Sequence, residues 1–139
     1  MTKLTKEQEN KIFDEIYDKW TNWLIGERKP KITNLKKVKE IVSYLYQSSS
    51  HSPPKEIKVI DGAKDAKKHR IGSPSYLFYY VPNIIKLEFL IKLNKYRDYE
   101  AEAIRDLLEC GVFALDCFAQ TAYVMKMPKK LLIDDRWRL

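Results

Sequence analysis

Apolar residues recur at helical spacing through the first 25 positions of the chain. Thr5 and Gln8 have the spacing of a capping box, in which the Thr side chain accepts an N–H of the first turn and Gln8 reaches back to the cap. Apolar side chains then follow at every fourth position, at Ile12, Ile16, Trp20 and Leu24. We therefore predict a helix that begins after Thr5 and ends near Gly26.

A second amphipathic pattern follows a break at Pro30. Thr33 or Asn34 can cap this helix. Its buried side is marked by Leu35, Val38, Ile41, Val42 and Leu45. The lysines between these positions must face outward. Because residues 26–32 make a short connection, we expect the two helices to pack as an antiparallel hairpin with its basic residues outside.

The middle of the chain mixes a strand pattern with its most apolar run. Residues 55–60 alternate polar with apolar, which is typical of a short strand covered on one side. Residues 63–69 can form one or two helical turns. Between Tyr76 and Leu93 a short segment precedes Pro82, where a helix is expected to begin because proline is tolerated in the first turn. That helix has little polar surface, so we predict that it is the central and most enclosed one.

The last 40 residues predict a helix and a small amount of strand. The helix starts near Glu100, and Gly111 can end it, although the apolar run 112–119 can also continue it. Residues 121–127 have a pattern typical of a strand. Asp134 and Asp135 are typical of a hairpin turn between residues 131–133 and 136–139. The prediction is a single α+β domain over residues 1–139. It is mostly helical, with about four helices and a small sheet that includes a C-terminal hairpin.

Two patches of the chain resemble an uncharacterised bacterial domain family. The first comprises Leu4-Thr5-Lys6-Glu7-Gln8, Trp20, residues 37–46 and Pro53-Pro54-Lys55, and is similar to that family's opening "LTxEQ" helix, tryptophan, helix ending in "LY", proline and strand. The second, residues 127–139, resembles the family's "RPxxIxxDxxGRLH" ending. The two patches occur in the same order and cover about half of the chain. The resemblance implies a bacterial protein with an α+β fold.

The same patches depart from the family pattern at positions that matter. Met127 stands where the family has an arginine, Trp137 stands at or near its glycine, and the sequence stops at Leu139, where its histidine would follow. An activity that rests on this histidine is therefore not expected here. The family has no assigned reaction, so the resemblance implies no function.

Composition narrows the class of protein. The chain is 45% apolar and 32% charged with four glycines, which is typical of a folded globular protein. No stretch approaches the roughly 18 apolar residues of a membrane span, and the first residues lack the apolar core of a signal peptide. We expect a cytoplasmic protein that does not enter a membrane.

Candidate catalytic and metal chemistry is sparse. Two cysteines and two histidines at scattered positions do not make a zinc finger, and the glycines never cluster into a phosphate loop. Cys110 and Cys117 would share one face of a helix about 10 Å apart, so free buried thiols are expected. Asp134 and Asp135, with Asp116 or Glu109, are better explained as solvated acids than as a magnesium site. We predict no catalytic residue, metal or cofactor, and a metal-dependent enzyme is the weakest alternative.

The charge of the protein is concentrated in one stretch. Residues 26–70 contain twelve basic and five acidic residues, which accounts for the whole net charge of +7. Concentrated cations are typical of a surface that meets a polyanion, although charge runs are often only solvated faces. The residues predicted to bind nucleic acid or an acidic partner are Lys36, Lys37, Lys39, Lys64, Lys67, Lys68 and Arg70.

Tyrosine-rich segments support a second hypothesis. Tyr and Trp carry more interface energy than their number suggests. A protein interaction module or a dimer would use Tyr76, Tyr79, Tyr80 and Trp137 as its anchors. The two hypotheses share one conclusion, a small non-catalytic binding protein, and they differ in the surface that makes the contact.

Overall fold

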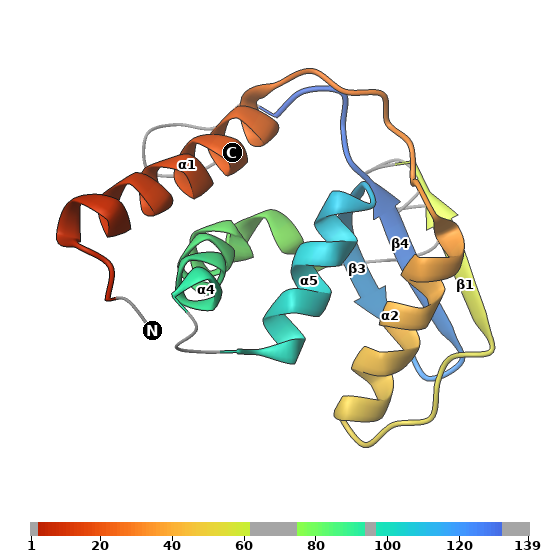
Figure 1. Cartoon of the computed structure of the whole chain (residues 1–139). Coiled ribbons are helices and arrows are strands. Elements are labelled where there is room, and N and C mark those ends of the chain that lie inside the picture. Colours follow the sequence, from red (N-terminus) through yellow and green to blue (C-terminus); the bar gives the residue numbers. More distant parts are fainter. Residues whose placement is uncertain (1–2, 62–74, 94–96, 132–139) are drawn as a thin grey trace.

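The computed structural model describes residues 3–61, 75–93 and 97–131. Within these ranges the chain forms four α-helices, a 3-10 turn (η1, Leu77–Tyr80) and a four-stranded sheet. Figure 1 shows the helices packed around one side of the sheet. The predicted α+β fold, mostly helical with a small sheet, is confirmed. None of the described helices is long and apolar enough to cross a membrane.

Helix α1 spans Lys6–Ile25 and has the predicted cap. The Gln8 N–H donates to Thr5 Oγ1 at 3.1 Å, and the Thr5 N–H donates to Gln8 Oε1 at 2.8 Å. The helix ends at Gly26, whose N–H donates to the Asn22 carbonyl. Its buried residues, Ile16, Trp20 and Leu24, belong to the predicted stripe. The predicted limits and buried face of this helix are therefore confirmed.

Helix α2 spans Leu35–Ser48, and Asn34 caps it by accepting the Lys37 N–H at 3.1 Å. The predicted hairpin of α1 with α2 is wrong. Helix α1 packs on α4 (Val81–Lys92), whereas α2 packs on α5 (Tyr99–Glu109). Figure 1 shows the connection between α1 and α2 as a long arc that carries α2 to the far side of the molecule. An apolar stripe shows which face of a helix is buried but does not name the partner.

The sheet has the strand order β1-β4-β3-β2. Strand β1 (Glu56–Ile60) runs parallel to β4 (Thr121–Lys126), and both match predicted strands. Strand β3 (Val112–Cys117) is antiparallel to β4 and to the two-residue edge strand β2 (Ser75–Tyr76). The described hairpin of the C-terminal part is thus β3–β4. The predicted turn at Asp134 and Asp135 lies outside the described residues, as do residues 63–69.

Gly111 separates α5 from β3. It has a φ of 92°, a left-handed conformation in which glycine costs little, and its N–H donates to the Leu108 carbonyl. Of the two sequence alternatives, Gly111 ends the helix, and the continuation through residues 112–119 is wrong. Residues 112–115 are all buried, which explains why a continuous apolar run hid a strand.

Helix α4 begins at Val81, next to the predicted Pro82 in its first turn, and lies between α1 and α5 (Figure 1). Its residues Val81, Ile84 and Ile85 are buried in a core to which all four helices and strands β1, β3 and β4 contribute. Trp20 and Phe78 are the largest fully buried side chains of that core. This packing agrees with the central position that the sequence predicts for α4.

Candidate functional site

The described part of the predicted basic site lies on the first turns of α2. Lys36, Lys37 and Lys39 are exposed, while Val38 between them is fully buried. None of the three lysines takes part in an ion pair among the described residues. Their outward position is therefore confirmed, and their charges are not neutralised by described carboxylates. The other four predicted residues, Lys64, Lys67, Lys68 and Arg70, lie outside the described residues.

The structure adds a second basic segment next to the first. The Arg28 N–H donates to the Lys129 carbonyl at 2.9 Å, which places the end of α1 beside the segment that leaves β4. Figure 1 shows this segment rising from β4 to the end of α1. The Thr33 N–H also donates to the Cys110 carbonyl at 2.9 Å, which fixes the connection against the end of α5.

Seven exposed lysines follow this connection, and we call them the basic ridge. They are Lys29, Lys31, Lys36, Lys37, Lys39, Lys129 and Lys130. The acidic residues on the same two segments, 27–40 and 127–131, are Glu27 and Glu40. The sequence analysis missed Lys129 and Lys130. Two adjacent lysines do not indicate that they lie in space beside lysines about 100 residues earlier in the chain.

Arg28 belongs to the same basic stretch but has a structural role. Its guanidinium Nη2 donates to the Trp23 carbonyl, to the Leu24 carbonyl at 2.8 Å and to the Gly26 carbonyl at 3.0 Å. The guanidinium carbon Cζ lies 4.8 Å from the centre of the Trp23 ring. The last carbonyls of α1 carry the negative end of the helix dipole, so this cation stabilises the helix end. Burial lowers the pKa of Arg28. We therefore leave Arg28 out of the basic ridge.

Tyr76 and Tyr79, two of the tyrosines singled out in the sequence, form an exposed pair at the edge of the sheet, and Tyr80 is also exposed. Tyr76 is 37% exposed, Tyr79 56% and Tyr80 42%. The Tyr76 ring lies 6.4 Å from that of Tyr79 and 5.3 Å from that of Phe113, between ring centres. Strand β2, which holds Tyr76, is the edge strand next to β3. Trp137, the fourth predicted anchor, lies outside the described residues.

The two cysteines differ from each other. Cys110 is buried, as expected, but Cys117 is exposed and lies at the end of β3, so the predicted helical spacing between them does not apply. Burial raises the pKa of the Cys110 thiol, and desolvation of the Cys117 thiol raises its pKa although the residue as a whole is exposed. Both shifts oppose the thiolate form that a nucleophile requires. Among the described residues no three His, Cys, Asp or Glu side chains gather as metal ligands.

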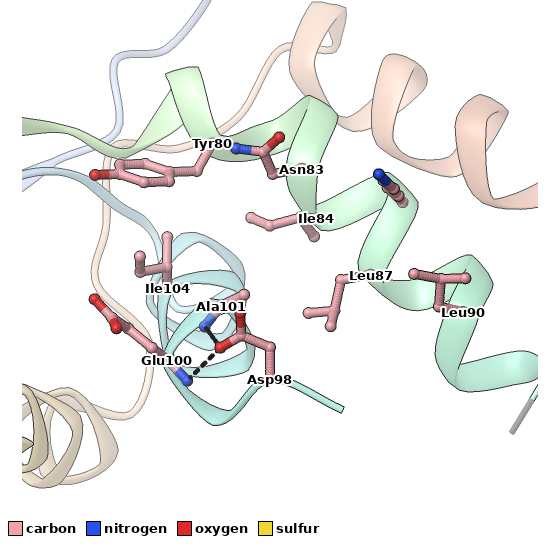
Figure 2. Close-up of a pocket in the computed structure, with 10 residues that line it drawn as sticks. Tyr80, Asn83, Ile84, Leu87, Leu90, Asp98, Glu100, Ala101 and Ile104 are labelled. Atoms are coloured by element: carbon pink, nitrogen blue, oxygen red, sulfur yellow. Dashed lines mark hydrogen bonds between the residues drawn. The ribbon is translucent and has the colours of Figure 1, made fainter. Parts of the chain in front are cut away.

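A cavity of about 440 Å³ lies between α4 and α5. Its apolar wall consists of Ile84, Leu87, Leu90, Ala101 and Ile104. Figure 2 shows Ile84 and Leu87 pointing from α4 toward α5. Polar side chains surround this wall, and they are Tyr80, Asn83, Lys86, Asp98 and Glu100. The sequence analysis did not find this cavity, because helix periodicity shows burial and not a gap between two packed helices.

Comparisons with protein families, with curated proteins and with solved structures found no match for this chain. The function is therefore inferred from the residues and their geometry.

Proposed function

We propose that this protein is a small, non-catalytic binding protein that attaches to the phosphate backbone of nucleic acid through the basic ridge. The observation that carries the proposal is the hydrogen bond from the Arg28 N–H to the Lys129 carbonyl, which brings Lys129 and Lys130 beside the beginning of the lysine-bearing segment 29–39. The lysines of both segments are exposed and belong to no ion pair among the described residues.

The chemistry of the ridge suits phosphate and not base recognition. Lysine is a flexible point charge that contacts single phosphates and releases their counterions. The described ridge segments, 29–39 and 129–130, contain no aromatic residue on which a base could stack. Such a surface predicts binding that depends strongly on salt and weakly on base sequence.

The test is fluorescence anisotropy with a labelled duplex of random sequence. We expect binding at about 50 mM salt that falls by orders of magnitude at about 200 mM. Reversing three ridge charges in Lys36→Glu, Lys37→Glu and Lys39→Glu should abolish it. The matched control reverses three exposed lysines near the start of α1, in Lys3→Glu, Lys6→Glu and Lys11→Glu, with the same change in net charge. Equal loss in both variants, or no binding at low salt, would overturn the proposal.

The exposed pair of Tyr76 and Tyr79 supports a second candidate function, contact with a protein. Two exposed tyrosines in ring contact at a sheet edge are typical of an interface anchor. The partner under this hypothesis is an acidic protein or a second copy of the chain. Sedimentation velocity of the wild type and of Tyr79→Ser, over a range of concentrations, tests the second copy. A dimer that dissociates in the variant would favour this function, and a concentration-independent monomer would remove the dimer.

A further inference from the structure

The sheet has two edge strands, β1 and β2, and they differ in length. Strand β1 has five residues, whereas β2 has two. Figure 1 shows β1 at the outer end of the sheet, beside β4. Within the part of the chain that the structure describes, no strand pairs with the outer side of β1. Such an edge presents backbone N–H and C=O groups with which another strand can pair.

The two faces of β1 carry different side chains. Glu56 and Lys58 point to the same face, where the Lys58 Nζ lies 4.0 Å from the Glu56 Oε1. On the other face Ile57 packs against the core, and Val59 is an exposed large apolar residue. A strand that pairs with β1 would therefore meet an acid and a base on one face and an apolar surface on the other.

We propose that β1 pairs with β1 of a second copy of this chain, antiparallel and about a two-fold axis. In such a pair one residue of the strand faces its own copy. If that residue is Ile57, Glu56 faces Lys58 of the second copy, and Lys58 faces the second copy's Glu56. Charges of opposite sign then lie opposite each other on one face. On the other face Val59 meets the aliphatic stem of Lys55 of the second copy.

The charges select this register among those centred within β1. If Glu56 or Lys58 faced its own copy, two like charges would meet on the axis, which is destabilising. If Val59 or Ile60 faced its own copy, Lys58 would lie opposite an uncharged residue. The register centred on Ile57 is the one that places both charges opposite their counter-charges.

This contact lies at the opposite edge of the sheet from Tyr76 and Tyr79, and it does not depend on the basic ridge. Sedimentation velocity of the full chain over concentrations up to about 1 mM tests it. We expect the wild type to form a dimer as the concentration rises. In Lys58→Glu, and separately in Glu56→Lys, both attractive pairs become repulsive. The dissociation constant of each variant should therefore rise about tenfold or more.

A mixture of the two variants tests the register itself. One variant carries lysine at both positions 56 and 58, and the other carries glutamate at both. Each is repelled by its own copy, but in the proposed register the two variants complement each other. Their equimolar mixture should form a heterodimer with a dissociation constant within about threefold of the wild-type value. The control Tyr79→Ser, at the other edge, should dimerise like the wild type.

Three results would overturn the proposal: a wild type that is monomeric at about 1 mM, single variants that dimerise like the wild type, or a mixture that stays monomeric. A dimer that is lost in Tyr79→Ser and kept in Lys58→Glu would overturn it as well, and would assign the contact to the tyrosine edge. Circular dichroism checks that each variant is folded. If one single variant does not fold, the chain with both Glu56→Lys and Lys58→Glu replaces the mixture, and it should dimerise like the wild type.

Discussion

The end of α1 and the start of α2 carry cations of the same basic stretch, yet they use them differently. Arg28 is half-buried and holds three carbonyls at the end of α1. Lys36, Lys37 and Lys39, eight to eleven residues later, are exposed and unpaired among the described residues. A run of positive charge is therefore not one surface. Only the cations that the fold leaves without a structural task are available to a partner.

The largest expected effect breaks the contact that holds the connection between these two regions against the end of α5. A Cβ at Gly111 would lie 2.3 Å from the Lys31 carbonyl oxygen, and φ of 92° is unfavourable for other residues. We expect Gly111→Ala to lower the free energy of unfolding by about 3 kcal/mol, measured by urea denaturation. The control is Gly26→Ala, where φ is −72° and the nearest atom lies 3.0 Å away, with a cost below about 1 kcal/mol. Equal costs would contradict the described position of the connection.

The second-largest expected effect on stability distinguishes Arg28, which holds the end of α1, from the neighbouring Lys29. Arg28→Ala removes a charged donor from three carbonyls and should lower the free energy of unfolding by about 2 kcal/mol. The adjacent Lys29 is exposed, so Lys29→Ala should change stability by no more than about 0.5 kcal/mol. If the two substitutions lower the free energy of unfolding equally, in thermal or urea unfolding, then Arg28 has no structural role that Lys29 lacks.

The two ends of α2 also differ, because Tyr46 near its C-terminal end is hydrogen-bonded whereas the lysines near its start are exposed. The buried Tyr46 hydroxyl donates to the Phe118 carbonyl at 2.6 Å. Burial raises the pKa of Tyr46 above its ordinary value of 10.0. The folded state therefore holds this proton more tightly than the unfolded chain, so stability falls as pH rises above about 10. Tyr46→Phe should cost about 1 kcal/mol at neutral pH and show a weaker alkaline decline.

The control for this prediction is Tyr44→Phe on the same helix, where the side chain is 40% exposed. It should keep the wild-type stability at neutral pH and the wild-type decline above pH 10. Urea unfolding at a series of pH values compares the three proteins. An unchanged alkaline decline in Tyr46→Phe would show that the Tyr46 hydroxyl does not couple folding to pH.

The smallest expected effect on stability comes from the ridge. Exposed substitutions usually change stability by about 0.5 kcal/mol or less, so the reversal of Lys36, Lys37 and Lys39 to Glu should leave a folded protein. Circular dichroism and urea unfolding check this. A variant that unfolds would show that these lysines support the fold in the manner of Arg28.

Much of the fold was predictable from local signals, and much of the candidate site was not. The Thr5 cap, the Asn34 cap, the proline start of α4 and strand β1 all follow from neighbours in sequence. The separation of α1 from α2 depends instead on hydrogen bonds from the connection to Lys129 and Cys110, which are distant in sequence. The same distant contacts bring Lys129 to the ridge. Spacing along a chain describes one element, whereas a site depends on which elements meet.

The central claim is that the basic ridge, and not net charge alone, contacts phosphate. The most direct test is the slope of the logarithm of the duplex binding constant against the logarithm of salt concentration, for the wild type and for two neutralised variants. Replacing Lys36, Lys37 and Lys39 with Gln should make the slope shallower by about 0.9 for each phosphate that the protein no longer neutralises, and replacing Lys3, Lys6 and Lys11 with Gln should leave it unchanged. An unchanged slope in the ridge variant, or an equal change in both variants, would contradict the claim.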